Sequence, residues 1–152
     1  MPEGGNIAAE LAEDHEHIQS LLTEALALSP GDGGRRSVIN EASVWLLRHS
    51  TAEERYLYPA IREHLPDGAR LARDQERDQA HVAALVEAVA GRDEQDEVFE
   101  DLLHQLFIAV GEHIATQDTT LFPLLLDACP PDQADDLARL VQSVRRGGLR
   151  RV

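Results

Sequence analysis

The chain has 152 residues, which suits one domain with its own hydrophobic core, and it carries a formal net charge of −14. Hydrophobic residues make up 43% of it and aromatic residues only 4%, a composition that favours helices packed through small side chains over a β-sandwich. The negative charge repels phosphate backbones, so we expect no binding to nucleic acid. No apolar stretch approaches the roughly 20 residues of a membrane helix, so we expect no contact with a membrane.

Helix-breaking residues divide the chain at four places, 29–34, 65–68, 91–93 and 129–132. Between these breaks, apolar residues recur at helical spacing in four long segments and in a shorter fifth one. The apolar positions are Ile7, Leu11, Ile18, Leu22 and Ala25; Val38, Ala42, Trp45, Ala52 and Tyr56; Leu71, Leu85 and Ala88; Phe99, Leu103, Leu106, Val110, Leu121 and Leu124; and Leu137, Leu140, Val141 and Val144. Because the connections are short, neighbouring helices should run antiparallel. The sequence predicts an all-α, up-down-up-down four-helix bundle over residues 1–128, with a C-terminal helix and basic tail over residues 129–152 packed on the bundle or extending from it.

The second and fourth helices carry a repeated pattern. In each, a histidine stands ten residues before a proline, as His49 before Pro59 and His113 before Pro123, with an aromatic residue directly ahead of the proline. The two copies are 113 − 49 = 64 residues apart. Two similar helical hairpins would explain this offset.

Four histidines, one on each long helix, should point into the bundle. They are His15, His49, His81 and His113, and each lies on or beside the apolar stripe of its helix. In an antiparallel hairpin, residues at equal height are equidistant from the turn, and the midpoints of 15 with 49 and of 49 with 81, residues 32 and 65, both fall in predicted turns. Buried imidazoles packed together leave nitrogen atoms without partners, at about 1–3 kcal/mol each. A metal ion would bond to these nitrogen atoms and so remove that cost.

A carboxylate joins this set. Glu53 follows His49 by four residues, so both side chains share one helix face and can reach the same ion. Imidazole with carboxylate suits iron, manganese or zinc, and a carboxylate in a bundle core can bridge two metals. Asp78 and Tyr56 are weaker candidates for contact with the site. The remaining histidines are expected to be structural: His17, His64 and His104.

Together these residues resemble the hemerythrin-like (HHE cation-binding) domain, over roughly residues 5–127. The resemblance rests on Asp14-His15, on His49-x3-Glu53-Glu54 running to Leu57-Tyr58-Pro59, on His81, and on His113 with Leu121-Phe122-Pro123. It implies a non-haem di-iron centre in a four-helix bundle. Carried over by position, His15 and His49 would serve one iron, His81 and His113 the other, and Glu53 would bridge.

Two positions depart from the family pattern. Arg77 stands where the oxygen carriers have a second histidine on the third helix, and it cannot ligate a metal. Gln117 stands where many relatives have a glutamate, four residues after the last histidine. The resemblance implies that the neighbouring Asp118 is the second bridging ligand, turned inward by a local π-bulge.

The resemblance implies that the small molecule handled is dioxygen, peroxide or nitric oxide, and peroxide- or nitric oxide-consuming activity is one form this could take. Two alternatives remain open. One is a metal- or oxygen-dependent sensor whose partner protein contacts the C-terminal helix, which has a basic end at Arg145, Arg146, Arg150 and Arg151. The other is iron storage, or a bundle that has lost its metal. The single Cys129 and the absence of a secretory signal at the first residues predict a cytoplasmic location.

Overall fold

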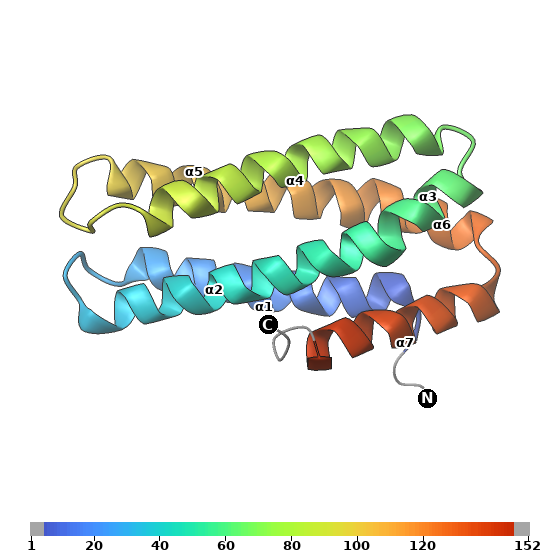
Figure 1. The fold of residues 1–152 in the computed structure, drawn as a ribbon, viewed down its shortest axis with the longest axis horizontal. Helices are drawn as coiled ribbons and strands as arrows, with labels where there is room; N and C mark the ends of the chain where they lie inside the picture. The colour runs from blue at the N-terminus through green and yellow to red at the C-terminus, as the bar shows by residue number, and fades with distance from the viewer. Residues whose placement is uncertain (1–4, 148–152) are drawn as a thin grey trace.

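The computed structural model describes residues 5–147, and these form a bundle of four long helical rods with one further helix against its side (Figure 1). The first rod is α1 (Ile7–Ala27) and the third is α4 (Gly68–Ala90). The second joins α2 (Gly33–Ala52), the π-helical turn η1 (Glu53–Leu57) and α3 (Tyr58–His64). The fourth joins α5 (Phe99–Thr116), the π-helical turn η2 (Gln117–Leu121) and α6 (Phe122–Ala128), and α7 (Pro131–Gly147) follows. The predicted all-α bundle with an added C-terminal helix is confirmed.

Local sequence sets where the first two rods begin. Asn6 caps α1, its side chain accepting a hydrogen bond from the Ala9 N–H at 2.9 Å. Asp32 caps α2 in the same way, accepting from the Gly34 N–H at 2.8 Å. Both caps follow or lie in breaker-rich sequence, so the rods begin close to where the pattern predicts.

The two π-helical turns lie just ahead of the two prolines of the repeat. A proline inside an α-helix has no N–H to donate, and its ring presses on the carbonyl one turn back. Each rod accommodates this with one wider turn: the Tyr58 N–H donates to the Glu53 carbonyl, and the Phe122 N–H donates to the Gln117 carbonyl. Each wide turn starts four residues after a histidine, at Glu53 after His49 and at Gln117 after His113. Both turns therefore begin at the same height along the bundle as the buried polar side chains described next.

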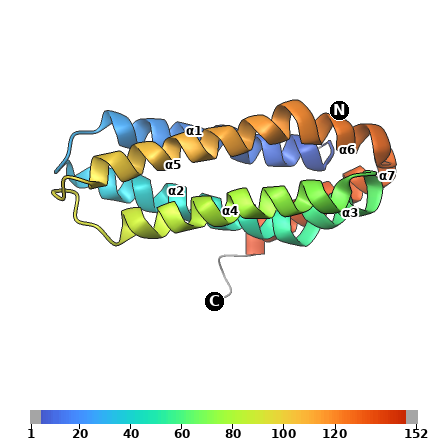
Figure 2. The same ribbon diagram turned by 90° about the horizontal axis from the view of Figure 1, so that it is seen from above.

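The core consists of two apolar clusters with a polar layer between them. One cluster gathers around Ile7, Leu57 and Leu125 near the α3–α4 turn, and the other around Ile18, Ile39 and Leu103 toward the opposite end. Fully or largely buried polar side chains occupy the level between them: His15, His49, Glu53, Gln75, Gln79, His113 and Gln117. Turned by 90°, the ribbon shows the long rods lying side by side along the length of the bundle (Figure 2).

Helix α7 packs along α1 and α2 at the end of the bundle that holds the first cluster. Its buried face consists of Ala134, Ala138, Val141 and Val144. This arrangement brings the C-terminal part of α7 beside the polar layer. None of the helices within residues 5–147 combines the length and apolar character that a membrane-crossing segment requires.

Candidate metal centre

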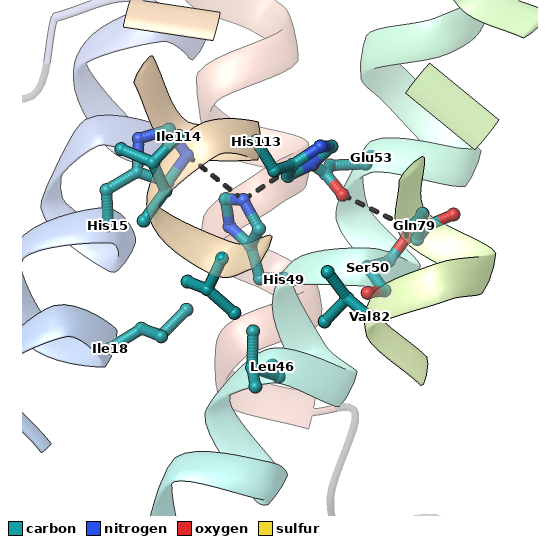
Figure 3. A pocket seen from close by; sticks show the side chains of 11 residues that line it. His15, Ile18, Leu46, His49, Ser50, Glu53, Gln79, Val82, His113 and Ile114 are labelled. Atoms are coloured by element: carbon teal, nitrogen blue, oxygen red, sulfur yellow. Dashed lines mark hydrogen bonds and ion pairs between the residues drawn. The ribbon is translucent and has the colours of Figure 1, made fainter. Parts of the chain in front are cut away.

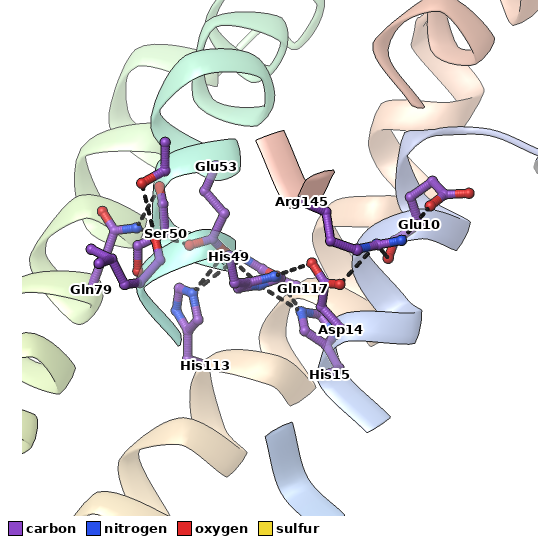
Figure 4. Close-up of polar contacts among 12 residues, drawn as sticks. Glu10, Asp14, His15, His49, Ser50, Glu53, Gln79, His113, Gln117 and Arg145 are labelled. Atoms are coloured by element: carbon purple, nitrogen blue, oxygen red, sulfur yellow. Dashed lines mark hydrogen bonds and ion pairs between the residues drawn. The ribbon is translucent and has the colours of Figure 1, made fainter. Parts of the chain in front are cut away.

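Three of the four predicted histidines and the predicted glutamate meet in the polar layer (Figure 4). His15 comes from α1, His49 from α2, Glu53 from η1 and His113 from α5. The Nε2 atoms of His15 and His49 are 3.2 Å apart. Oε2 of Glu53 lies 3.2 Å from Nε2 of His49 and 3.1 Å from Nε2 of His113. All four side chains are buried, so these atoms meet away from bulk water.

Carboxylates outside this group fix the orientation of two imidazoles. Nδ1 of His49 lies 3.0 Å from Asp14, and Nδ1 of His15 lies 3.0 Å from Asp118. A carboxylate at Nδ1 accepts an N–H there, so in each neutral ring Nε2 keeps its lone pair and faces the centre. A carboxylate behind an inward-facing imidazole is the arrangement that orients metal-binding histidines.

The third imidazole, that of His113, turns a donor nitrogen toward the centre instead of an acceptor. Nδ1 of His113 is buried and has no hydrogen-bond partner, while its Nε2 faces the Glu53 carboxylate. A neutral His113 therefore places its proton on Nε2 and donates to Glu53, because the other tautomer would bury an N–H with no acceptor. His113 is thus set to donate a hydrogen bond to Glu53.

Charge at the centre follows from these contacts. Burial disfavours the charged ring of His49, but Glu53 and Asp14 outweigh it and raise the pKa of His49 to about 10. Burial and the charge of His49 lower the pKa of His15 to about 4. Burial alone would raise the pKa of Glu53, but His49 and His113 hold it well below its ordinary value. The inward-facing lone pairs therefore require one cation, which is a proton on His49 when no metal is bound.

The expected inward orientation of His81 is wrong, because its side chain lies on the exposed face of α4. The inward positions on that helix belong to Gln75, Gln79 and Val82. His81 lines a surface hollow together with Asp78, which is also exposed, and with one side of His113. Helix α4, the third rod, therefore brings amides and no imidazole to the centre.

The expected inward orientation of Asp118 is also wrong. The predicted π-helical turn is present, but it begins at Gln117. Gln117 therefore lies one regular α-helical turn after His113, on the same face of the helix, and it is fully buried. Asp118 comes next round the helix, its side chain is 41% exposed, and it contacts His15 only from behind. The extra residue of the wide turn shifts the chain after Gln117 and leaves Asp118 outside the centre.

Gln75, Gln79 and Tyr58 were missed in the sequence, whereas Gln117 was noted there only as a departure from the family pattern. Nε2 of Gln79 donates to Oε1 of Glu53 at 2.9 Å, and the Tyr58 hydroxyl donates to the same oxygen at 3.3 Å. Gln117 donates to Oε2 of Glu53 at 2.5 Å and to Gln75 at 2.8 Å. The sequence singled out Tyr56, which is only partly buried and packs on the first apolar cluster. The signal for Gln117 was its place in the repeat, four residues after His113, as Glu53 follows His49.

Helix α7 reaches the centre through Arg145. Its guanidinium donates to Oδ1 of Asp14 at 2.8 Å and to Glu10 at 3.2 Å, while Oδ2 of the same Asp14 holds His49. A charge-assisted chain therefore runs from α7 through α1 to an inward-facing imidazole (Figure 4). Arg146 is exposed, and the other predicted basic residues, Arg150 and Arg151, lie outside the described residues.

The donor set fits a metal ion in its chemistry. Two imidazoles with a carboxylate are ligands of non-haem iron, manganese or zinc. Neighbouring ligand atoms around an ion bound at about 2.1 Å stand about 3.0–3.4 Å apart, and the contacts at 3.2 Å fall in that range. As the side chains stand, no three His, Cys, Asp or Glu residues of the described part surround a single point that an ion could fill. The side chains of His15, His49 and Glu53 would therefore have to shift to surround an ion that takes the place of the proton on His49.

Comparisons with known proteins show the family and the fold. The hemerythrin HHE cation binding domain family matches residues 6–125, and the chain belongs to that family. A solved structure, an HHE cation-binding-domain protein from Mycobacterium kansasii, superposes with a TM-score of 0.79 over 95% of this chain and 90% of that one, at 15% identity. A DNA nickase from Nostoc sp. is 25% identical over 133 residues. The alignment takes in 88% of this chain but only 37% of the nickase.

Proposed function

We propose that this protein binds iron at His15, His49 and Glu53 and uses it to bind or react with dioxygen, peroxide or nitric oxide. The observation that carries the proposal is the meeting of two oriented imidazole nitrogens and a carboxylate in a buried layer. Manganese and zinc share these ligands, but the redox chemistry that these small molecules require favours iron. The protein's own contribution is to hold the donors in a buried layer away from bulk water.

The cavity beside the donors supports a very small ligand. It has a volume of about 20 Å³ and is lined by His15, His49 and Glu53 on one side (Figure 3). The rest of its wall is mostly apolar and includes Ile18, Leu46, Val82, Val110 and Ile114. Such a space admits a molecule about the size of water and excludes a larger organic substrate. Apolar walls favour a weakly polar diatomic over an ion.

A groove on the surface between α2 and α4 supplies the route inward. Its apolar lining includes Val44 and Leu47, which are exposed, and Val86. The groove and the small cavity share four lining residues, Leu46, Ser50, Gln79 and Val82. The cavity and the groove adjoin at these side chains, so motion of the side chains there would admit a small molecule.

We expect metal-free protein to retain ferrous iron after anaerobic loading and desalting, and the loaded protein to change its visible absorption when nitric oxide, dioxygen or peroxide is added. His49→Gln should lose the iron, because it removes an oriented donor nitrogen. His17→Gln is the matched control, since His17 lies beside Trp45, away from the centre, and should retain iron as wild type does. Protein that retains no iron, or loaded protein that responds to none of the three ligands, would contradict the proposal.

A metal-dependent sensor remains the second candidate, favoured by the chain from Arg145 through Asp14 to His49. We expect iron loading to slow amide hydrogen exchange along α7, and Arg145→Met to abolish that response and weaken iron binding by about 10–100-fold. Methionine keeps the packing of the aliphatic stem, and Arg146→Met at an exposed position is the control. Equal exchange in α7 with and without iron would exclude coupling of this kind.

Cleavage of DNA is not part of the function that we propose for this chain. The net charge of −14 opposes contact with a phosphate backbone, and the chain spans little more than a third of the Nostoc relative. The absence of nucleic-acid binding and the cytoplasmic location stay predictions.

A further inference from the structure

We infer that the centre holds one metal ion, on the His15 and His49 side of Glu53, and that protein N–H groups occupy the other side, where a second ion would sit. This inference rests on the proposed metal binding and specifies its stoichiometry. The prediction of two ions depended on His81 and Asp118 pointing inward. Neither does, and the side chains that replace them are amides.

On one side of the centre, acceptor atoms face one another. Nε2 of His15 lies 3.2 Å from Nε2 of His49 and 2.9 Å from Oε1 of Gln117. Nε2 of His49 in turn lies 3.2 Å from Oε2 of Glu53. The carboxylates at Nδ1 of both rings leave lone pairs directed inward, so these four atoms attract a cation. They supply two nitrogens and two oxygens to a single ion.

On the other side, donors already satisfy the acceptors. The Gln117 amide nitrogen lies 2.5 Å from Oε2 of Glu53 and 2.8 Å from Oε1 of Gln75. Its oxygen cannot take that place, because it would then face the carboxylate. His113 adds a second N–H to Oε2 of Glu53. Two N–H donors stand here, where a second ion would need ligands with free lone pairs.

The remaining oxygen of Glu53 is engaged as well. A carboxylate that bridges two ions offers one oxygen to each. Oε1 of Glu53 instead accepts hydrogen bonds from Gln79 and from the Tyr58 hydroxyl. Only Oε2 faces the imidazoles, so Glu53 is arranged to give one oxygen to one ion.

Metal stoichiometry tests the inference directly. Metal-free wild type is titrated anaerobically with ferrous iron, and in parallel with manganese(II), and bound metal is counted by mass spectrometry after desalting. We expect one ion per chain, and for manganese the paramagnetic resonance spectrum of an isolated ion.

The Gln117→Glu variant puts a second carboxylate against Glu53. A second cation would relieve the repulsion between the two carboxylates, so this variant should be less stable without metal and should bind two ions. Gln105→Glu, at an exposed position on α5, is the matched control and should bind one.

A histidine pair separates the alternatives even if Gln117→Glu fails to fold. Glutamine at position 113 keeps an N–H donor toward Glu53, so His113→Gln should still bind one ion, whereas His15→Gln should bind none. Two ions on wild type, or loss of the ion in His113→Gln, would overturn the inference and leave the proposed metal binding intact. Wild type that binds no ion at all would instead overturn the proposed function.

Discussion

The Glu53→Gln variant should lose metal binding, and its metal-free form should be less stable than wild type. Among residues 5–147, Glu53 is the only carboxylate whose oxygen faces the inward imidazole nitrogens, so its loss should weaken metal affinity by more than the roughly 10–100-fold that loss of an outer partner causes. Isothermal titration with ferrous iron or manganese(II) measures this loss. Thermal unfolding in the presence of a chelator measures the stability of the metal-free form.

The expected stability follows from donors and acceptors at the centre. Whichever way a glutamine amide stands at position 53, its NH2 group meets donors. Oε2 of Glu53 accepts from Gln117 and His113, and Oε1 accepts from Gln79 and Tyr58. An N–H group in either place lacks an acceptor, at about 1–3 kcal/mol. Unchanged metal-free stability would show that the centre can repack around an uncharged residue at position 53.

Glu54→Gln is the matched control. It makes the same chemical change one residue along the same π-helical turn, but at an exposed position. We expect metal affinity within a few-fold of wild type. If both variants lost metal equally, the loss would reflect the net charge of the protein and would not identify Glu53 as a ligand.

The sequence predicted the bundle and the height of the centre because both depend on spacing. Breakers and apolar periodicity define four rods, equal distances from the first turn place His15 and His49 at one height, and the repeat makes His113 the counterpart of His49. His15 and His49 lie between apolar neighbours that are buried, such as Leu11 and Ile18, so their direction followed from the stripe.

The same reasoning failed on α4 for a physical reason. Distance from a turn fixes the height of a residue along the bundle but not its direction around the helix. His81 lies level with the centre, against one side of His113, yet outside it. The inward face of α4 is polar at that level, since Gln75 and Gln79 occupy it, and Leu71, taken as a core position, is only partly buried. Hydropathy cannot reveal a buried stripe of glutamines.

The turn between α3 and α4 gives the second large expected effect. We expect Gly68→Ala to destabilise the protein by about 3 kcal/mol, at the upper end for an overpacked site. A Cβ at Gly68 would lie 2.1 Å from the Ile61 carbonyl oxygen and 2.8 Å from Cα of Arg62. Both are backbone atoms, which cannot rotate aside, so α3 and the start of α4 must move apart. Urea unfolding followed by circular dichroism measures the change.

Gly111→Ala provides the opposite control, because a Cβ there meets nothing within 4 Å inside α5. It should stabilise the protein by about 0.5–1 kcal/mol, since alanine loses less conformational freedom in a helix than glycine does. The α3–α4 turn also sets how Gln79 on α4 meets Glu53 on the preceding rod. Gly68→Ala should therefore weaken metal binding even under conditions where the variant remains folded. Unchanged metal affinity in the folded variant would show that the centre tolerates movement of α4, and that the glutamines of this helix do not position Glu53.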